Sequence, residues 1–328
     1  MERYINSFAS ENDIQIALQN GELLKPYVAY IEDADRIDWN SKEKVDYTTE
    51  YLTFNILSAG TINWTASDSS VTKTIEYKLN SNEWASITSN TGETAPTITV
   101  NSGDKLQFRG NNTQYATDGS IYNSFGGSTA LFEVEGNIMS LIYGDEFKNK
   151  LTINDYAFTG LFRDCVNLVS AENLILPATT LTSNCYRSMF QGCASLTTAP
   201  ELPATKLTTA CYQYMFKGCT SLITAPALPA TALAYNCYQY MFAGCASLTT
   251  APELPSTKLA GFCYGNMFYG CTNLNYIKCL ATDISALYCT SSWVKGVAST
   301  GTFVKNPNMT GWTTGDNGIP TGWTVQDA

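Results

Sequence analysis

Between residues 46 and 146, hydrophobic and polar positions alternate in short runs that are separated by Asn, Gly, Ser and Asp. Runs such as YLTFNIL and KLQFRG place every second side chain on one face, which is typical of strands in a half-buried sheet. The stretch EYKLNSNEWASI indicates a hairpin that turns at about residues 80–83. We therefore predict an antiparallel β-sandwich over 46–146.

From residue 147 to residue 300 the pattern changes to a phrase that recurs every 26 residues, such as CYQYMFKGCTSLITAPALPATAL from Cys211. One cysteine column contains Cys185, Cys211, Cys237, Cys263 and Cys289, and the other contains Cys165, Cys193, Cys219, Cys245 and Cys271. A repeat of this length that cannot bury its apolar residues alone predicts a stack of coils, each of which covers the next.

Each repeat contains two predicted elements. Cys185, Met189 and Cys193 lie at i, i+4 and i+8, which indicates one face of a short helical segment that ends at Gly192. The following SLTTAP is too short for a helix and favours a strand, which the prolines after it would end. The sequence thus predicts one strand and one helical turn for each coil.

The two ends of the chain differ from the repeats. Residues 1–45 indicate a small α+β module, with a helix capped by Ser10 and ended by Gly21, and with strands in PYVAYI and DRIDWN. Residues 301–328 hold Trp312 and Trp323 and are predicted to cap the last coil. The predicted class is a mixed α/β multidomain protein that consists of 1–45, 46–146, 147–300 and 301–328.

The cysteines have three candidate explanations, which are a core ladder, a metal site and a disulfide array. The spacing of eight within a coil does not suit zinc, and the chain has no histidine to complete such a site. Disulfides between coils are geometrically conceivable, but the total of 11 cysteines is odd. We predict reduced thiols in a dry core, with no metal and no cofactor.

The distribution of charge excludes some classes of binding partner. The net charge is −10, and residues 1–150 carry 11 basic against 21 acidic side chains. No basic face for nucleic acid is visible, and no apolar run is long enough to span a bilayer, so neither nucleic acid nor membrane insertion is expected. The N-terminus carries charges where a signal peptide has its apolar region. The sequence does not decide where the protein is located, and a cell surface and a virion are the two alternatives.

The chain has no histidine, so it lacks the commonest general base and most nucleophile–base arrangements. This excludes many classes of enzyme. We therefore predict no catalytic residues. The remaining enzymatic alternative is a carboxylate-dependent glycoside hydrolase that uses, for example, Asp104 with Asp118 or Glu83.

The phrase MFxGCxSLTTAPxLPAT resembles the BspA-like bacterial leucine-rich repeat family, with its F-x-G-C-x-S-L and Leu-Pro core, over about residues 150–300. The resemblance implies a right-handed leucine-rich-repeat solenoid with 26-residue repeats and a role in surface interaction and adhesion. Similar cassettes occur in gut Bacteroidetes and in their phages and prophages.

We therefore predict a non-catalytic surface-recognition or adhesion protein that binds a protein or glycan on a cell surface. A phage or prophage virion protein is the alternative. The predicted binding residues lie on repeated positions and are Thr198, Thr224, Thr250, Glu201, Glu253, Tyr212 and Tyr238. The tyrosine column is either an exposed stripe or buried between coils. Trp64, Trp84, Tyr115 and Tyr122 either bind sugars or fill the sandwich core.

Overall fold

The computed structural model describes residues 7–8, 28–31, 37–38, 47–92 and 95–328, and the chain forms two compact units, Met1–Asp46 and Tyr47–Ala328. In the first unit, β1 (Ser7–Phe8), β2 (Val28–Ile31) and β3 (Ile37–Asp38) form one sheet in that order. β2 runs parallel to β1 and antiparallel to β3. β2 and β3 confirm the two strands predicted here, whereas the predicted helix lies outside the described residues.

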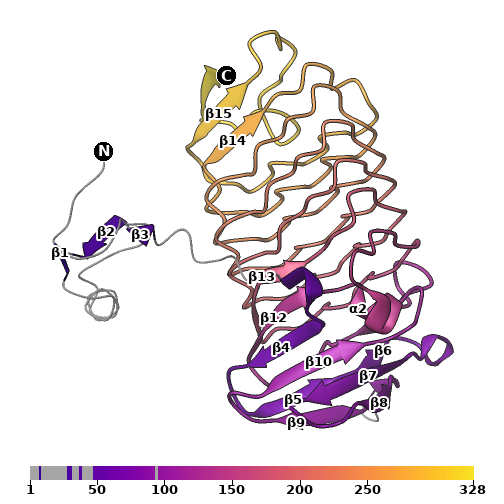
Figure 1. Ribbon diagram of the computed structural model, residues 1–328. Coiled ribbons are helices and arrows are strands. Elements are labelled where there is room, and N and C mark those ends of the chain that lie inside the picture. Colours follow the sequence, from indigo (N-terminus) through magenta and orange to yellow (C-terminus); the bar gives the residue numbers. More distant parts are fainter. Residues whose placement is uncertain (1–6, 9–27, 32–36, 39–46, 93–94) are drawn as a thin grey trace. The chain divides into compact units, whose positions relative to one another are not determined.

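The second unit begins with a six-stranded sheet (Figure 1). Its strands are β4 (Leu52–Ile56), β7 (Thr74–Leu79), β8 (Ala85–Thr88), β10 (Lys105–Arg109), β12 (Phe132–Asn137) and β13 (Leu168–Ile175). Their order is β13-β12-β4-β10-β7-β8, and every pair is antiparallel except β12 with β13. β13 belongs to the first repeat, so the sheet and the repeats share a strand.

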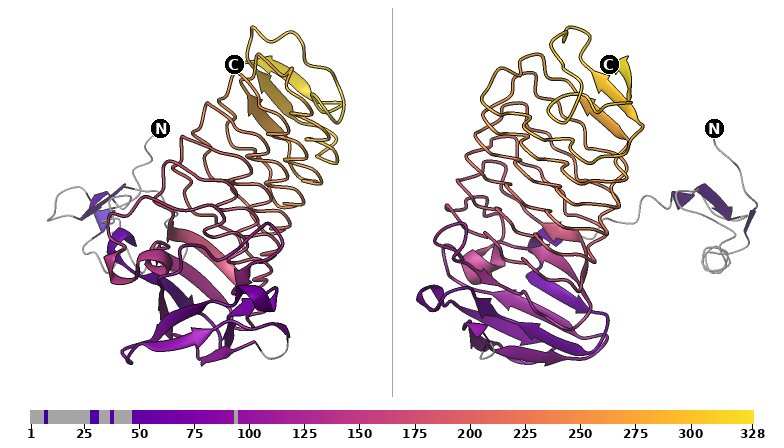
Figure 2. Two further views of the ribbon diagram at one scale, coloured as in Figure 1. Left: turned by 90° about the vertical axis from the view of Figure 1, so that its right-hand side faces the viewer. Right: turned by 180° about the vertical axis from the view of Figure 1, so that it is seen from behind.

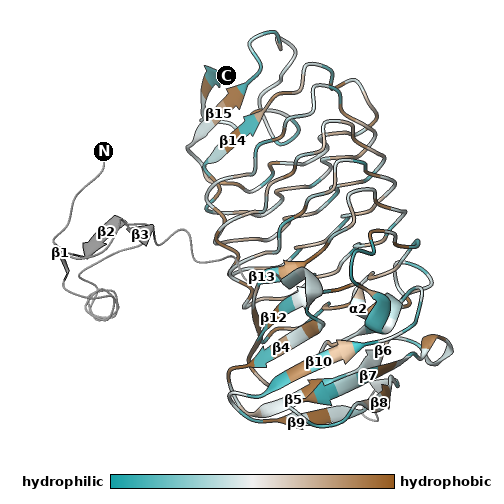
Figure 3. Cartoon of the chain, viewed as in Figure 1, coloured by the Kyte–Doolittle hydropathy of each residue, from teal (hydrophilic) through white to brown (hydrophobic). Residues whose placement is uncertain are grey.

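Two strand pairs and several short helices complete this part of the unit. They are β5 (Gly60–Asn63) with β9 (Thr97–Val100), β6 (Thr65–Ala66) with β11 (Asn123–Ser124), the α-helix α2 (Ser140–Tyr143), and the 3-10 turns η2 (Tyr47–Thr49), η3 (Ser69–Val71) and η5 (Gly144–Glu146). Hydrophobic and polar residues alternate along β7 and β10 (Figure 3). Phe54 of β4 meets Phe125, which also contacts Trp64, so the core lies between the sheet and the smaller pairs.

Residues 154–305, which we call the coil stack, form coils that lie one above another beyond the sheet (Figure 2). Successive coils are 26 residues apart, except that the first two are 28 residues apart. Each coil has a turn run, at 156–165, 184–193, 210–219, 236–245, 262–271 and 288–297, in which every fourth residue has a left-handed backbone. These left-handed residues are Tyr156, Gly160, Asp164, Asn184, Ser188, Gly192, Ala210, Tyr214, Gly218, Asn236, Tyr240, Gly244, Phe262, Asn266, Gly270, Tyr288, Ser292 and Gly296. The regular reversals keep the run from winding into a helix.

Backbone hydrogen bonds in a turn run alternate between two destinations. The N–H of Met189 donates to Tyr186 O three residues earlier at 3.3 Å, whereas the N–H of Tyr186 donates to Cys211 O of the next coil at 3.0 Å. The same step recurs from Tyr212 to Cys237 O at 3.1 Å. Half of the amides therefore hold the turns and the other half join the coils, which leaves none for an α-helical ladder.

The segments that connect successive turn runs contain little regular strand, and we call them the bridge-bearing segments. Isolated parallel bridges join Ser170 to Thr198, Thr198 to Thr224 and Thr250 to Tyr276. At the C-terminal end, β14 (Tyr276–Cys279), β15 (Thr302–Lys305) and β16 (Thr324–Asp327) form a parallel sheet in that order. Regular strands of the stack are thus found at its two ends.

One hydrophobic core runs through the second unit. One ring column contains Phe158, Tyr186, Tyr212, Tyr238, Tyr264 and Trp293, and the other contains Phe162, Phe190, Phe216, Phe242, Phe268 and Trp293. Both cysteine columns lie beside them and are 0–3% exposed, and all 11 cysteines are free. The prediction that the thiols fill the core is confirmed. The Trp312 ring stacks on Trp293 at 5.6 Å and closes the last coil.

The predicted mixed α/β class is wrong, and so is the predicted right-handed leucine-rich-repeat solenoid. Within the described residues the only α-helix is the four-residue α2, and the molecule is nearly all β and turn. The i, i+4, i+8 apolar positions are the inward corners of successive turns, since each left-handed residue reverses the chain between them. The 26-residue unit therefore lacks the strand and helix that the predicted solenoid requires.

Candidate binding surface

The outward side chains of the turn runs form the candidate surface. Tyr214 and Tyr240 occupy the same position in neighbouring coils, and their rings stack with centroids 5.0 Å apart. The ammonium group of Lys217 lies 5.4 Å from the Tyr214 centroid and 5.5 Å from that of Tyr240, within cation–π range. Gln213 donates a hydrogen bond to Gln239 beside them. We call Tyr214, Tyr240, Lys217 and Gln239 the tyrosine–lysine cluster.

A second group of rings is exposed towards the C-terminal end of the stack. The Tyr235 ring meets the Phe262 ring edge-on at 5.5 Å, and Phe262 meets Tyr288 at 5.0 Å. Tyr235 is 48% exposed, Tyr288 59% and the neighbouring Leu287 62%. We call Tyr235, Phe262, Leu287 and Tyr288 the aromatic patch. Such a concentration of exposed apolar area is typical of a contact surface.

The backbone beneath these rings is unfavourable for them. Tyr214 and Tyr240 have φ of 61° and 57°, and Phe262 and Tyr288 have φ of 55° and 50°. Bulky residues rarely adopt a left-handed backbone, whereas Asn does so several times more often. Local backbone propensity therefore does not explain why aromatic residues occupy these positions.

Equivalent positions in other coils provide an internal comparison. The column of Tyr214 and Tyr240 also contains Ser188, Asn266 and Ser292. The column of Phe262 and Tyr288 also contains Asn184, Ala210 and Asn236, and Tyr156 in the first turn run. Small or amide side chains thus satisfy the same backbone in three of the coils, and a ring at this position is not needed to pack them.

Next to the tyrosine–lysine cluster lies a polar pocket of about 210 Å³. It is lined by Gly119, Arg163, Arg187, Ser188, Gln191, Tyr214 and Lys217. The Arg163 guanidinium lies 5.1 Å from the Tyr122 ring, and that of Arg187 lies 5.5 Å from the Tyr214 ring. Three cations therefore surround one pocket beside stacked tyrosines, in a chain whose net charge is −10.

The predicted binding residues lie elsewhere. Thr224 and Thr250 are exposed on the bridge-bearing segments, while Thr198 is half-buried and its hydroxyl lies 2.6 Å from that of Ser170. Glu201 and Glu253 are exposed, and Glu253 forms an ion pair with Lys278 at 3.1 Å. The threonines and glutamates thus lie on segments different from the turn runs, and their role as a binding face stays a prediction.

Tyr212 and Tyr238 are misplaced as binding residues, since each is only 1% exposed. Their rings stack at 5.9 Å inside the core, and burial raises the pKa of each hydroxyl well above its usual value. The buried alternative for this column is therefore correct. Sequence reasoning missed Tyr214 and Tyr240, two residues further along, although their departure from Ser188 in the same column was a readable signal.

The exposed fraction also separates the aromatic residues of the 46–146 segment into core residues and partly exposed residues. Trp64 is 1% and Tyr115 0% exposed, so both fill the core. Trp84 is half-buried under the guanidinium of Arg109 at 4.3 Å, and Tyr122 is half-buried under Arg163. Only Tyr122 borders the candidate surface.

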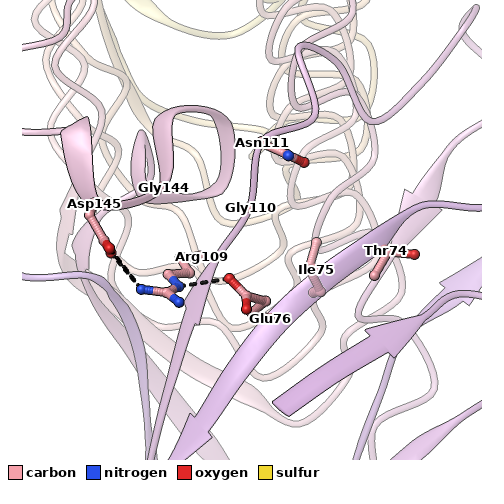
Figure 4. A pocket seen from close by; sticks show the side chains of 8 residues that line it. All are labelled: Thr74, Ile75, Glu76, Arg109, Gly110, Asn111, Gly144 and Asp145. Carbon is pink, nitrogen blue, oxygen red and sulfur yellow. Dashed lines mark hydrogen bonds and ion pairs between the residues drawn. The ribbon is translucent and has the colours of Figure 1, made fainter. Parts of the chain in front are cut away.

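A larger pocket, of about 480 Å³, lies where β7 begins and β10 ends, between two inner strands of the six-stranded sheet (Figure 4). Arg109 lies between two carboxylates there, with Nε 2.8 Å from Glu76 Oε2 and Nη1 2.7 Å from Asp145 Oδ1. Tyr51 donates a further hydrogen bond to Asp145 at 2.7 Å. These hydrogen bonds lower the pKa of Asp145, and two nitrogens of Arg109 are bound within the protein. The arrangement joins β7 and β10 to the residues after α2 and keeps Asp145 ionised, which does not suit proton donation.

The carboxylates named for the hydrolase alternative serve in turns. Asp104 accepts hydrogen bonds from the Asn80 amide at 2.8 Å and the Asn101 N–H at 2.7 Å. Asp118 accepts them from Ser120 N–H at 2.6 Å and Ile121 N–H at 2.9 Å. The hydrogen bonds lower the pKa of both aspartates, which is the opposite of what a general acid needs.

The comparisons add no family or relative to this geometry. No protein-family model matches the chain, and no curated protein and no solved structure matches it. Within the described part of the chain, no group of three or more Cys, Asp or Glu side chains is placed to hold a metal ion. Nor does any helix there have the length and apolar character to cross a bilayer.

Proposed function

We propose that the chain is a non-catalytic recognition protein that binds glycans through the outward side chains of its turn runs. The observation that carries this proposal is the placement of Tyr214, Tyr240, Phe262 and Tyr288 in left-handed positions. Six further positions of the two columns have Asn, Ser or Ala, and the first turn run has Tyr156 and Gly160. The six are Asn184, Ser188, Ala210, Asn236, Asn266 and Ser292. Residues that are kept against the local preference of the backbone are characteristic of functional sites.

The chemistry of the surface favours sugars as partners. Tyrosine presents an apolar ring and a hydroxyl on one rigid side chain, so it contacts both the C–H faces and the hydroxyls of a sugar. Gln239, Lys217 and Ser188 add hydrogen-bonding groups that lie beside the rings. Because Tyr214 and Gln213 recur as Tyr240 and Gln239 in the next coil, an extended saccharide would meet similar contacts at two successive steps.

A catalytic role has less support from the described residues. The carboxylates of the 480 Å³ pocket are held by Arg109, and Asp104 and Asp118 cap turns. Binding is better supported, since the turn runs present half-buried rings on a rigid, repetitive frame. The resemblance to bacterial repeat proteins of the adhesion type also remains a proposal that agrees with a binding role.

The test is a binding screen on an immobilised glycan array with the purified full-length chain. The Tyr214→Ser and Tyr240→Asn double variant replaces each ring with the residue of a neighbouring coil, so folding is preserved while the rings are lost. Its matched control is Tyr276→Thr, which places on the bridge-bearing segment the residue that Thr250 supplies one coil earlier. We expect the double variant to lose binding at least ten-fold and the control to retain it.

Two results would contradict this proposal. One is the absence of binding to any glycan by the unmodified chain. The other is unchanged binding by the double variant, with loss instead on Thr224→Lys or Thr250→Lys, which would assign recognition to the predicted threonine face. Circular dichroism of each variant verifies that the fold is intact.

A further inference from the structure

We infer that the pocket of Arg163, Arg187 and Lys217 is a subsite for the carboxylate of an acidic sugar, such as a uronic or sialic acid unit. This inference rests on the proposed glycan-binding function and adds the ligand's charge to it. The three cations come from three successive turn runs, so the regular stacking of the coils is what brings them together.

The positive charges of this pocket are only weakly compensated. Arg163 Nε lies 3.6 Å from Asp164 Oδ2, beyond hydrogen-bond distance, and the Asp164 side chain is 65% exposed. Arg187 and Lys217 form no ion pair with any of the residues that the structure describes. This differs from Arg109, whose guanidinium is bound by two carboxylates.

The arginines also keep unused hydrogen-bond donors. The Nε atoms of Arg163 and Arg187 are both buried and have no hydrogen-bond partner among the described residues. A buried donor without a partner is unfavourable, and it shows that the hydrogen-bonding capacity of these two guanidinium groups is not used up by the protein. The guanidinium fork matches a planar carboxylate with two parallel hydrogen bonds.

The surroundings position Arg187 for such a ligand. Its guanidinium lies directly against Gly119, where any side chain would collide with it. The ionised carboxylate of Asp118 interacts electrostatically with Arg187, but it accepts its hydrogen bonds from the N–H groups of Ser120 and Ile121 and forms no ion pair with the guanidinium. Arg187 is therefore held in place by packing and by the Tyr214 ring, and no described carboxylate pairs with it directly.

Size and charge favour a sugar acid over a nucleic acid. The pocket holds about 210 Å³, which suits one carboxylate-bearing unit, and it directly adjoins Tyr214 of the tyrosine–lysine cluster. A nucleic-acid surface requires a row of phosphate contacts along a basic stripe. The column of Lys217 contains Arg163 and Gln191 before it and Ala243 and Tyr269 after it, and the column of Arg187 continues with Gln213 and Gln239, so the cations form no continuous basic stripe along these coils.

The experiment uses isothermal titration calorimetry with two pairs of probes. The acidic probes are a galacturonic acid trimer and sialyllactose, and their neutral counterparts are the methyl-esterified trimer and lactose. The variants of the full-length chain are Arg187→Gln, Arg187→Lys and Tyr240→Asn. The matched control is Lys206→Gln, which removes an exposed cation from a bridge-bearing segment.

We expect at least one acidic probe to bind ten-fold or more tightly than its neutral counterpart. Arg187→Gln should abolish this preference, Arg187→Lys should restore it in part, and Lys206→Gln should leave it intact. Tyr240→Asn should weaken acidic and neutral probes alike.

Equal affinity for acidic and neutral probes, or an acid preference that survives Arg187→Gln, overturns the carboxylate subsite and leaves the recognition proposal standing. Loss of acid preference on Lys206→Gln overturns it too, since the effect would then be one of general charge. Absence of binding to all four probes overturns the subsite, while the array result decides the recognition proposal independently.

Discussion

The ring of Phe162 in the first coil stacks on the ring of Phe190 in the second, with centroids 5.3 Å apart and planes 10° apart. Phe162 also contacts Phe125 at 5.8 Å and Phe54 at 6.0 Å, both in the sheet-bearing part of the unit. A single residue thus joins the core of the six-stranded sheet to the column that runs through the coils.

Replacement of this residue should destabilise both parts together. Phe162→Ala removes a fully buried ring, and we expect a loss of about 3–5 kcal/mol in the free energy of unfolding. Urea unfolding followed by far-UV and near-UV circular dichroism should show one shared transition at a lower midpoint. Separate transitions for the unmodified chain would show that the two parts fold independently.

Stability should fall at alkaline pH because of the cysteine columns. Burial raises the pKa of Cys211 and of Cys271 to about 12, whereas a thiol in the unfolded chain has a pKa of about 8.5. Between these values the unfolded state has lost protons that the folded state retains, so rising pH favours unfolding. Below about pH 8 this effect is absent.

The expected size is about 1.4 kcal/mol per buried thiol at one pH unit above the unfolded pKa. Urea midpoints measured from pH 7 to pH 10.5 check this, and Cys219→Val should make the decline less steep. Thiol labelling of the native protein at pH 8 should be slow and should accelerate on unfolding. Rapid labelling of Cys219 in the native state would contradict its buried position.

Aromatic residues in left-handed positions should cost stability. Tyr288→Asn replaces a half-exposed ring at φ 50° with the residue found at Asn184 and Asn236 in the same column. We expect stability to rise by about 0.5–1 kcal/mol, because Asn adopts this backbone more readily. The reverse change, Asn184→Tyr, should lower it by a similar amount. Chemical denaturation of both variants tests the sign, and a destabilised Tyr288→Asn would remove the main support for a functional role of the ring.

The ion-pair network of Figure 4 should contribute to stability alone. Arg109→Ala removes hydrogen bonds to Glu76 and Asp145 and the contact with the Trp84 ring, and we expect a loss of about 1–2 kcal/mol. Part of this loss should disappear at high salt, since Asp145 is 59% exposed. Glycan affinity should stay unchanged, and a large change in affinity would place a ligand in this pocket instead.

Sequence reasoning found the period and the inward positions because the cysteines, Met189 and Phe190 repeat in register. It failed on the local conformation, since apolar residues four apart suit a helix and a run of turns equally well. The distinguishing signal was Gly192 together with Asn184 eight residues earlier, two residue types that tolerate a left-handed backbone. The sequence of one coil does not show that alternate N–H groups donate to the next coil, because those hydrogen bonds form only when the coils stack.

The candidate surface was missed for a related reason. Attention to what repeats singled out Tyr212 and Tyr238, which belong to a column of tyrosines that recurs in four coils because its rings fill the core. The surface is formed by residues that vary between coils, such as Phe262 and Tyr288, where two other coils have Asn. In a repetitive chain, exceptions on an outward column are the better guide to function.

The alternating amides of the turn runs have a consequence for how such a molecule changes in length. The N–H of Tyr186 meets Cys211 O, and the N–H of Tyr212 meets Cys237 O in the same way. Excision of residues 211–236 would therefore bring Tyr186 to an identical acceptor, and duplication would add one more identical step. Loss or gain of whole 26-residue coils would therefore change the spacing between recognition groups in fixed steps and leave the packing of the remaining coils unchanged.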